Sequence, residues 1–106
     1  MINYTTPTIT LEVEGVDLTQ NQDVYVTMLQ GKTELQKTGE YLDISYAEKS
    51  TIVLSLTQEE SADFQPSRTV QVQVNWITDE GERGATNIAT IKVFRNLLEE
   101  VISYGN

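Results

Sequence analysis

The chain has 106 residues, a length typical of a single domain with its own hydrophobic core. It contains no cysteine and no histidine. This excludes disulfide bonds, thiolate chemistry and the imidazole that most often moves protons or binds metals near neutral pH. Its seven basic and sixteen acidic residues give a net charge of −9, which argues against binding of nucleic acid through a basic face.

The acidic charge leaves two interpretations open. It keeps a small protein soluble, and it also suits docking to a basic partner or mimicry of nucleic acid. No apolar run approaches the roughly 20 residues of a membrane-spanning helix. The start, MINYTTPT, lacks the basic end and apolar core of a signal peptide. We therefore expect a soluble chain that makes no membrane contact and is not itself exported.

The first half of the chain alternates between apolar and polar residues, which indicates strands with one buried face. We expect strands over residues 8–13, 24–30, 33–37 and 41–46, the last of them at a sheet edge. The side chains expected to face inward are Ile9, Leu11, Val13, Val24, Val26, Met28, Leu35, Leu42, Ile44 and Tyr46. Val16 and Leu18 are expected to pack the intervening loop against one end of the sheet.

A short helical turn is predicted near residues 57–63. Thr57 matches an N-cap residue, and Glu60 stands three positions later, which is the spacing of a capping box. Ala62 and Phe64 are the expected inward contacts of this turn. The turn should close one end of a sandwich and carry the chain from one sheet to the other.

Residues 68–77 predict the long central strand, because apolar side chains recur there at every second position. A hairpin turn at Asp79-Glu80-Gly81 leads into a last strand over residues 83–93. Gly84 indicates a bulge or a close approach early in that strand. The core predicted for this half of the chain is Ile52, Leu54, Leu56, Val70, Val72, Val74, Trp76, Ile91 and Val93, with Ala89 beside it.

Residues 96–106 form a C-terminal tail with an apolar stripe. Leu97, Leu98, Val101 and Ile102 recur at helical spacing, so the segment predicts a short helix or a last turn and tail. The stripe either docks a partner or caps an open end of the domain's own core. We take these four residues and Tyr104 as the candidate interface.

Carboxylates are the only catalytic groups that this composition leaves in number. Adjacent pairs occur at Glu59-Glu60, Asp79-Glu80 and Glu99-Glu100, but neighbouring side chains on a strand or helix diverge. Glu82 follows one of these pairs, yet the acidic spacing of a calcium loop is absent. No glycine-rich phosphate loop or nucleophile elbow is present. We therefore expect no catalytic residue, cofactor, metal or small-molecule substrate.

The segments Ile52–Phe64, Val70–Trp76, Asp79–Gly81 and Ile91–Val93 together resemble small β-sandwich virion proteins of tailed bacteriophages, including baseplate-adaptor domains. The order of the elements also resembles an immunoglobulin-like sandwich. The resemblance implies a structural subunit of the head, neck, tail or baseplate, present in several copies around a ring. Its partners would be other virion proteins and copies of itself, in the virion and, during assembly, in the host cytoplasm.

The sequence thus predicts one antiparallel, immunoglobulin-like β-sandwich of about seven strands over residues 1–106, with the tail at 96–106. The expected function is non-catalytic assembly through protein–protein docking. The alternative is a small acidic inhibitor or nucleic-acid mimic, encoded by a phage, that binds a basic groove of a host protein.

Overall fold

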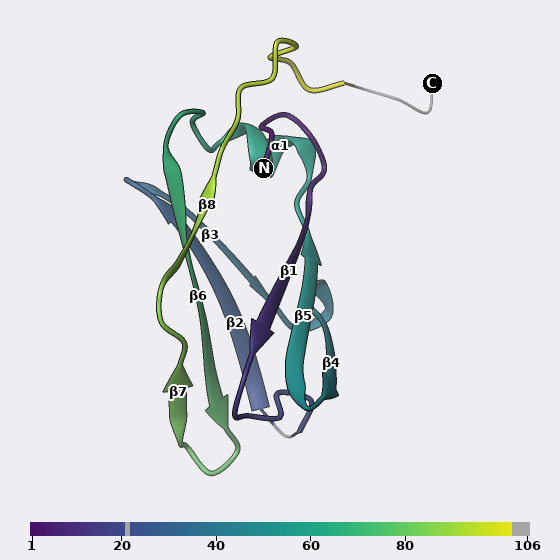
Figure 1. Ribbon diagram of the computed structural model, residues 1–106, viewed down its shortest axis with the longest axis vertical. Coiled ribbons are helices and arrows are strands. Elements are labelled where there is room, and N and C mark those ends of the chain that lie inside the picture. The colour runs from purple at the N-terminus through teal and green to yellow at the C-terminus, as the bar shows by residue number, and fades with distance from the viewer. Residues whose placement is uncertain (21, 103–106) are drawn as a thin grey trace.

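Two antiparallel sheets stack face to face in the computed structural model, which describes residues 1–20 and 22–102 (Figure 1). The three-stranded sheet has the order β1 (Thr8–Val13), β5 (Lys49–Ser55), β4 (Asp43–Ala47). The five-stranded sheet has the order β3 (Thr33–Thr38), β2 (Gln22–Gln30), β6 (Thr69–Thr78), and then both β7 (Arg83–Ala85) and β8 (Ala89–Lys92) pair with β6. The predicted all-β sandwich is confirmed.

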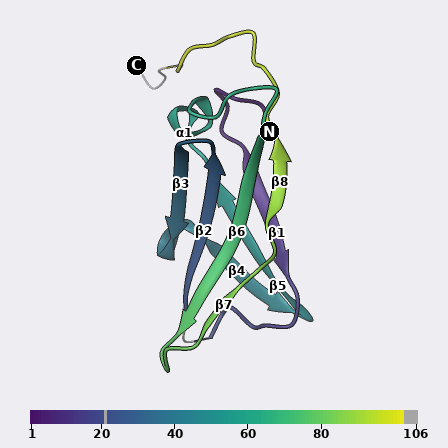
Figure 2. The same cartoon turned by 90° about the vertical axis from the view of Figure 1, so that its left-hand side faces the viewer.

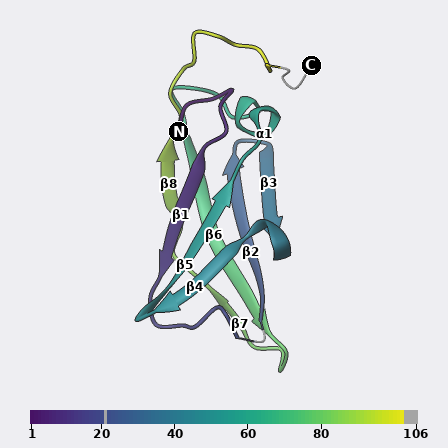
Figure 3. The same cartoon turned by 90° about the vertical axis from the view of Figure 1, so that its right-hand side faces the viewer.

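The chain changes sheets between β1 and β2, between β3 and β4, and between β5 and β6. A 3-10 turn, η1 (Gly39–Tyr41), makes the second of these crossings, and the helical turn α1 (Gln58–Ala62) makes the third. These crossings give the connection order of immunoglobulin-like sandwiches. Figure 2 shows β3, β2, β6 and β8 side by side in the five-stranded sheet, and Figure 3 shows β1, β5 and β4 on the opposite layer.

The described residues form eight strands because the strand expected over residues 83–93 is interrupted between β7 and β8. At the interruption, the backbone N–H of Val74 donates to the hydroxyl oxygen of Thr86 at 3.1 Å. The backbone N–H of Thr86 donates to the carbonyl oxygen of Val74 at 2.9 Å. A side-chain oxygen thus replaces a backbone carbonyl at this point of the ladder, and the strand restarts at Ala89.

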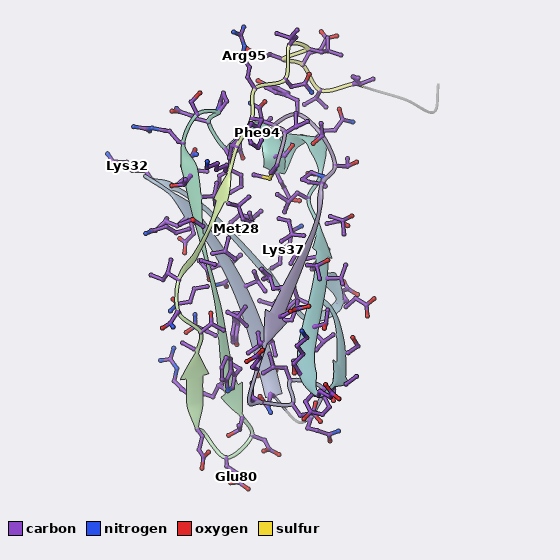
Figure 4. All side chains as sticks on the ribbon, in the orientation of Figure 1. Met28, Lys32, Lys37, Glu80, Phe94 and Arg95 are labelled. Atoms are coloured by element: carbon purple, nitrogen blue, oxygen red, sulfur yellow. The ribbon has the colours of Figure 1, made fainter. Side chains whose placement is uncertain are left out.

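Alternate side chains from both sheets meet in one core, in which Met28 lies between the layers (Figure 4). β6 supplies its inward valines, and Phe64, after α1, is fully buried. The buried apolar residues are Ile9, Val13, Leu18, Val24, Val26, Met28, Leu42, Ile52, Leu54, Leu56, Phe64, Val70, Val72, Val74 and Val93. This pattern places the inward face of each long strand where the period of two predicts it.

Some side chains expected in the core lie at its margin instead. Trp76 and Ile91 are half-buried and pack against the core, and Ala89 is exposed. Trp76 pairs with Gly84 of β7, and its ring lies over that glycine rather than deep between the sheets. Ile91 and Ala89 lie on β8, which pairs with β6 only along its short length. Tyr46 is also exposed, on the edge strand β4, which pairs with β5 alone.

The capping box predicted at α1 is present. The backbone N–H of Glu60 donates to the Thr57 hydroxyl at 3.1 Å, and the backbone N–H of Thr57 donates to Glu60 Oε1 at 2.8 Å. Ser61, rather than Ala62, is the fully buried residue of this turn. Its hydroxyl donates to the carbonyl oxygen of Thr5 at 2.6 Å and accepts from the Thr5 N–H at 3.0 Å. α1 therefore anchors the N-terminal segment to the end of the sandwich.

Candidate functional site

The N-terminal segment and the last strand meet at the α1 end of the molecule (Figure 1). The amino group of Met1 donates to the Lys92 carbonyl oxygen at 2.9 Å, and the N–H of Phe94 donates to the Met1 carbonyl oxygen at 2.7 Å. The N–H of Asn3 donates to the Phe94 carbonyl oxygen at 3.1 Å. This short parallel pairing extends the five-stranded sheet beyond β8. Because Val93 points into the core, Phe94 faces solvent.

The described part of the tail is hydrogen-bonded to the sandwich near both of its ends. Buried Asn3 accepts from the Asn96 N–H through Oδ1 at 3.0 Å, and Asn96 Oδ1 accepts from the Leu98 N–H at 3.0 Å. At the other end, Gln58 of α1 exchanges two hydrogen bonds with the backbone of Ile102, at 3.0 and 2.8 Å. The tail is therefore held as a loop across the end of the molecule.

Six large apolar side chains on this loop and beside it are exposed. Leu97 is 88% exposed, and Leu98, Val101 and Ile102 are between 45% and 49% exposed. We call the set Ile2, Phe94, Leu97, Leu98, Val101 and Ile102 the tail cluster. Scattered single apolar residues are normal on a protein surface, whereas a gathering of large ones marks an interaction site. The tail cluster is therefore the candidate docking surface.

Of the two forms expected for residues 96–102, the structure has the tail and no helix in the described residues. Arg95 and Glu99 still form an exposed ion pair at 3.0 Å with the spacing of neighbours on a helix. The Asn96 and Gln58 side chains hold the backbone in another conformation by bonding its N–H groups. The four predicted interface residues up to Ile102 lie together on this loop, and none belongs to the buried core. Tyr104 lies outside the described residues.

No sequence pattern pointed to the two residues that hold the tail. Asn3 and Gln58 are ordinary polar residues in sequence, and their partners lie 93 and 44 positions away. Only the meeting of the N-terminal segment, α1 and β8 at one end brings them to the tail.

Of the adjacent carboxylate pairs, the one at Glu59-Glu60 lies on α1. The paired glutamate of α1, Glu60, is engaged by Lys37 at 2.8 Å and by its cap bonds to Thr57. Partial burial works to raise the pKa of Glu60, but the hydrogen bonds from Lys37 and Thr57 outweigh it and hold that pKa below its usual value. Glu60 therefore stays ionised and serves the structure. The ammonium group of Lys37 also lies 5.1 Å from the centre of the Tyr41 ring.

Residues 1–20 and 22–102 contain no cluster of three or more acidic, histidine or cysteine side chains that could hold a metal ion. In the same residues, no helix has the length and apolar character to cross a bilayer. Comparison with known proteins finds no protein-family model that matches the chain and no significantly similar curated protein.

Proposed function

We propose that this chain is a non-catalytic structural subunit of a tailed-phage virion, in the head, neck, tail or baseplate, that docks onto other virion proteins and copies of itself. It would be found in the virion and, during assembly, in the host cytoplasm. The observation that carries this proposal is the exposed tail cluster on a loop held by Asn3 and Gln58. The sequence resemblance to small β-sandwich virion proteins supports the assignment to a phage particle.

Burial of the tail cluster by a partner would stabilise the complex. Full burial of one large aliphatic side chain stabilises a protein or complex by about 1.5–3 kcal/mol. In the isolated molecule Leu97 lacks most of this stabilisation, because it is 88% exposed. Leu98, Val101 and Ile102 lack about half of it. The hydrogen bonds to Asn3 and Gln58 fix the backbone beforehand, which lowers the entropy lost on docking. Apolar exposure and preorganisation together favour an assembly role over a solvated tail.

The experiment measures how much of each variant chain is incorporated into phage particles, in a host infected by the phage whose genome encodes this chain. Leu97→Ser with Leu98→Ser removes the apolar side chains at the centre of the tail cluster. Tyr46→Ser is the matched control, since Tyr46 is 48% exposed on β4, close to the 47% of Leu98. We expect the control chain to enter particles as the native chain does and the double variant to stay in the lysate, with equal thermal stability. Normal incorporation of the double variant would refute docking through this surface.

The alternative, an acidic inhibitor or nucleic-acid mimic, draws its support from the charge of −9 and from the opposite end of the molecule. There Asp79, Glu80 and Glu82 are exposed around the β6–β7 turn, with Glu80 at the tip (Figure 4). Binding of that kind weakens steeply as salt rises, whereas apolar docking does not. Retention of the partner in high salt therefore favours the assembly role.

A further inference from the structure

β1 is an outer strand whose free side carries unpaired backbone groups. It lies at the margin of the three-stranded sheet, next to β5 only (Figure 3). The Leu56 N–H donates to the Pro7 carbonyl oxygen at 3.0 Å, and Thr8 stands opposite Ser55. In an antiparallel ladder the bonded pairs alternate, so Ile9, Leu11 and Val13 bond to β5. The N–H and C=O groups of the alternate residues, Thr8, Thr10 and Glu12, therefore point away from the sheet.

This edge lacks the devices that usually keep strand edges from pairing. The segment TITLEV contains no proline, and its one charged residue, Glu12, forms an exposed ion pair with Lys49 at 2.8 Å. That hydrogen bond also raises the pKa of Lys49. The other edge of the same sheet, β4, carries Asp43 and is bounded by Glu48, which has a positive φ. Among the described residues, β4 thus carries a carboxylate without an ion pair and adjoins a residue of positive φ, whereas Glu12 of β1 is ion-paired and neither neighbour of β1 has a positive φ.

A groove of about 540 Å³ runs beside β1 where the opposite sheet is interrupted between β7 and β8. Five of its nine lining residues are apolar, namely Leu11 and Val13 of β1, Val72 and Val74 of β6, and Ala89. A strand added to β1 could therefore place inward side chains over an apolar floor.

We infer that β1 pairs antiparallel with β1 of a second copy about a two-fold axis at Thr10, joining the two three-stranded sheets into one. In this register Thr10 stands opposite Thr10 of the second copy, and Thr8 opposite Glu12. The three residues with free backbone groups on each strand then meet one another as hydrogen-bonded pairs. On the inward face, Ile9 stands opposite Leu11, so apolar side chains meet.

The register follows from the charges and from the phase of the ladder. Centring the pair on Glu12 would set two carboxylates directly opposite each other, which destabilises a strand pair. Centring it on Ile9 or Leu11 would bring together backbone groups that already bond to β5. Thr10 is the central position of β1 that avoids both problems. The contact is self-complementary, as a two-fold interface requires.

This self-pairing rests on the proposed function, in which copies of the chain dock to one another, but its surface is separate from the tail cluster and it can be tested without a virion. The purified full chain should form dimers in sedimentation equilibrium at high protein concentration, since a strand-edge contact is a small interface. Thr10→Lys and Thr10→Glu each set like charges opposite one another across the axis. A mixture of the two, with one variant isotope-labelled for native mass spectrometry, should form heterodimers about threefold to thirtyfold tighter than either homodimer.

Ser45→Lys is the control for added charge, since Ser45 is exposed on β4 of the same sheet, and it should dimerise as the native chain does. Circular dichroism melts verify that each variant is folded. A native chain that is monomeric at every concentration would overturn the inference and leave β1 to a strand from a different protein. Equal affinities of the mixture and the separate variants would also overturn it. The two contacts can also be told apart in particles. If Thr10 variants enter particles normally and Leu97 and Leu98 variants do not, self-pairing through β1 is separate from docking through the tail cluster.

Discussion

Gly84 tests how closely β7 and β6 approach at the open end of the sandwich. A Cβ atom on Gly84 would lie 2.5 Å from the indole nitrogen of Trp76, and closer still to Cε2 and Cζ2 of the same ring. The backbone of Gly84 is outside the left-handed region, so alanine is allowed there on conformational grounds. The main effect of Gly84→Ala is therefore to displace the half-buried Trp76 ring that lies over the glycine.

The magnitude follows from two opposing effects. Pushing a packed ring aside costs about 1–3 kcal/mol, as other overpacking substitutions do. Alanine in place of glycine in a strand returns about 0.5–1 kcal/mol through the lower entropy of the unfolded chain. We expect a net loss of about 1 kcal/mol, within a range of about 0–2.5 kcal/mol, and each kcal/mol lowers the melting temperature of a domain of this size by about 4–8 °C. With Trp76→Val the ring is gone, so adding Gly84→Ala should be neutral or stabilising by up to about 1 kcal/mol.

The assay is urea unfolding of the native chain, both single variants and the double variant, followed by far-ultraviolet circular dichroism. The coupling free energy of this cycle should be about 1–3 kcal/mol. Ala85→Ser, at the exposed neighbouring position, is the control and should change stability by less than about 0.5 kcal/mol. An equal cost of Gly84→Ala with and without the Trp76 ring would refute the close approach.

Other predictions address the core, the cap and the tail. Phe64 is fully buried, so Phe64→Ala should lower the free energy of unfolding by about 3–5 kcal/mol in urea titrations, and a loss below about 1 kcal/mol would place that ring outside the core. Glu60 has a lowered pKa when folded, so its contribution is full above its ordinary value of 4.5 and is lost as the pH falls further, because the unfolded chain binds the proton more tightly. Melting temperatures of Glu60→Gln should therefore fall less than those of the native chain in acid, and parallel pH profiles would contradict the ion pair with Lys37. Gln58→Ala should speed hydrogen exchange at the Ile102 amide by about 2- to 10-fold in nuclear magnetic resonance, and an unchanged rate would mean that Gln58 does not hold the tail.

Most of the architecture could be read from local sequence signals. The period of two in β6 placed Val70, Val72 and Val74 in the core because a strand sends alternate side chains to opposite faces. The Thr57 and Glu60 spacing located the helical turn because a capping box is formed by residues three apart. In both cases the deciding contacts lie close together in the sequence.

The departures arise where a distant side chain decides the outcome. The hydroxyl of Thr86 interrupts the last strand by accepting a bond from Val74, and threonine gives no such signal in sequence. The spacing of the apolar residues in the tail located the exposed stripe but not its conformation. A helix of so few residues is marginal without a partner, and Asn3 and Gln58 capture the backbone instead.

The most direct test of the assembly role is quantitative mass spectrometry of purified virions from the strain that encodes this chain. The chain should be present in every preparation, in several copies per particle at a fixed ratio to the other structural proteins. Absence from particles, with abundant chain in the lysate of infected cells, would contradict it.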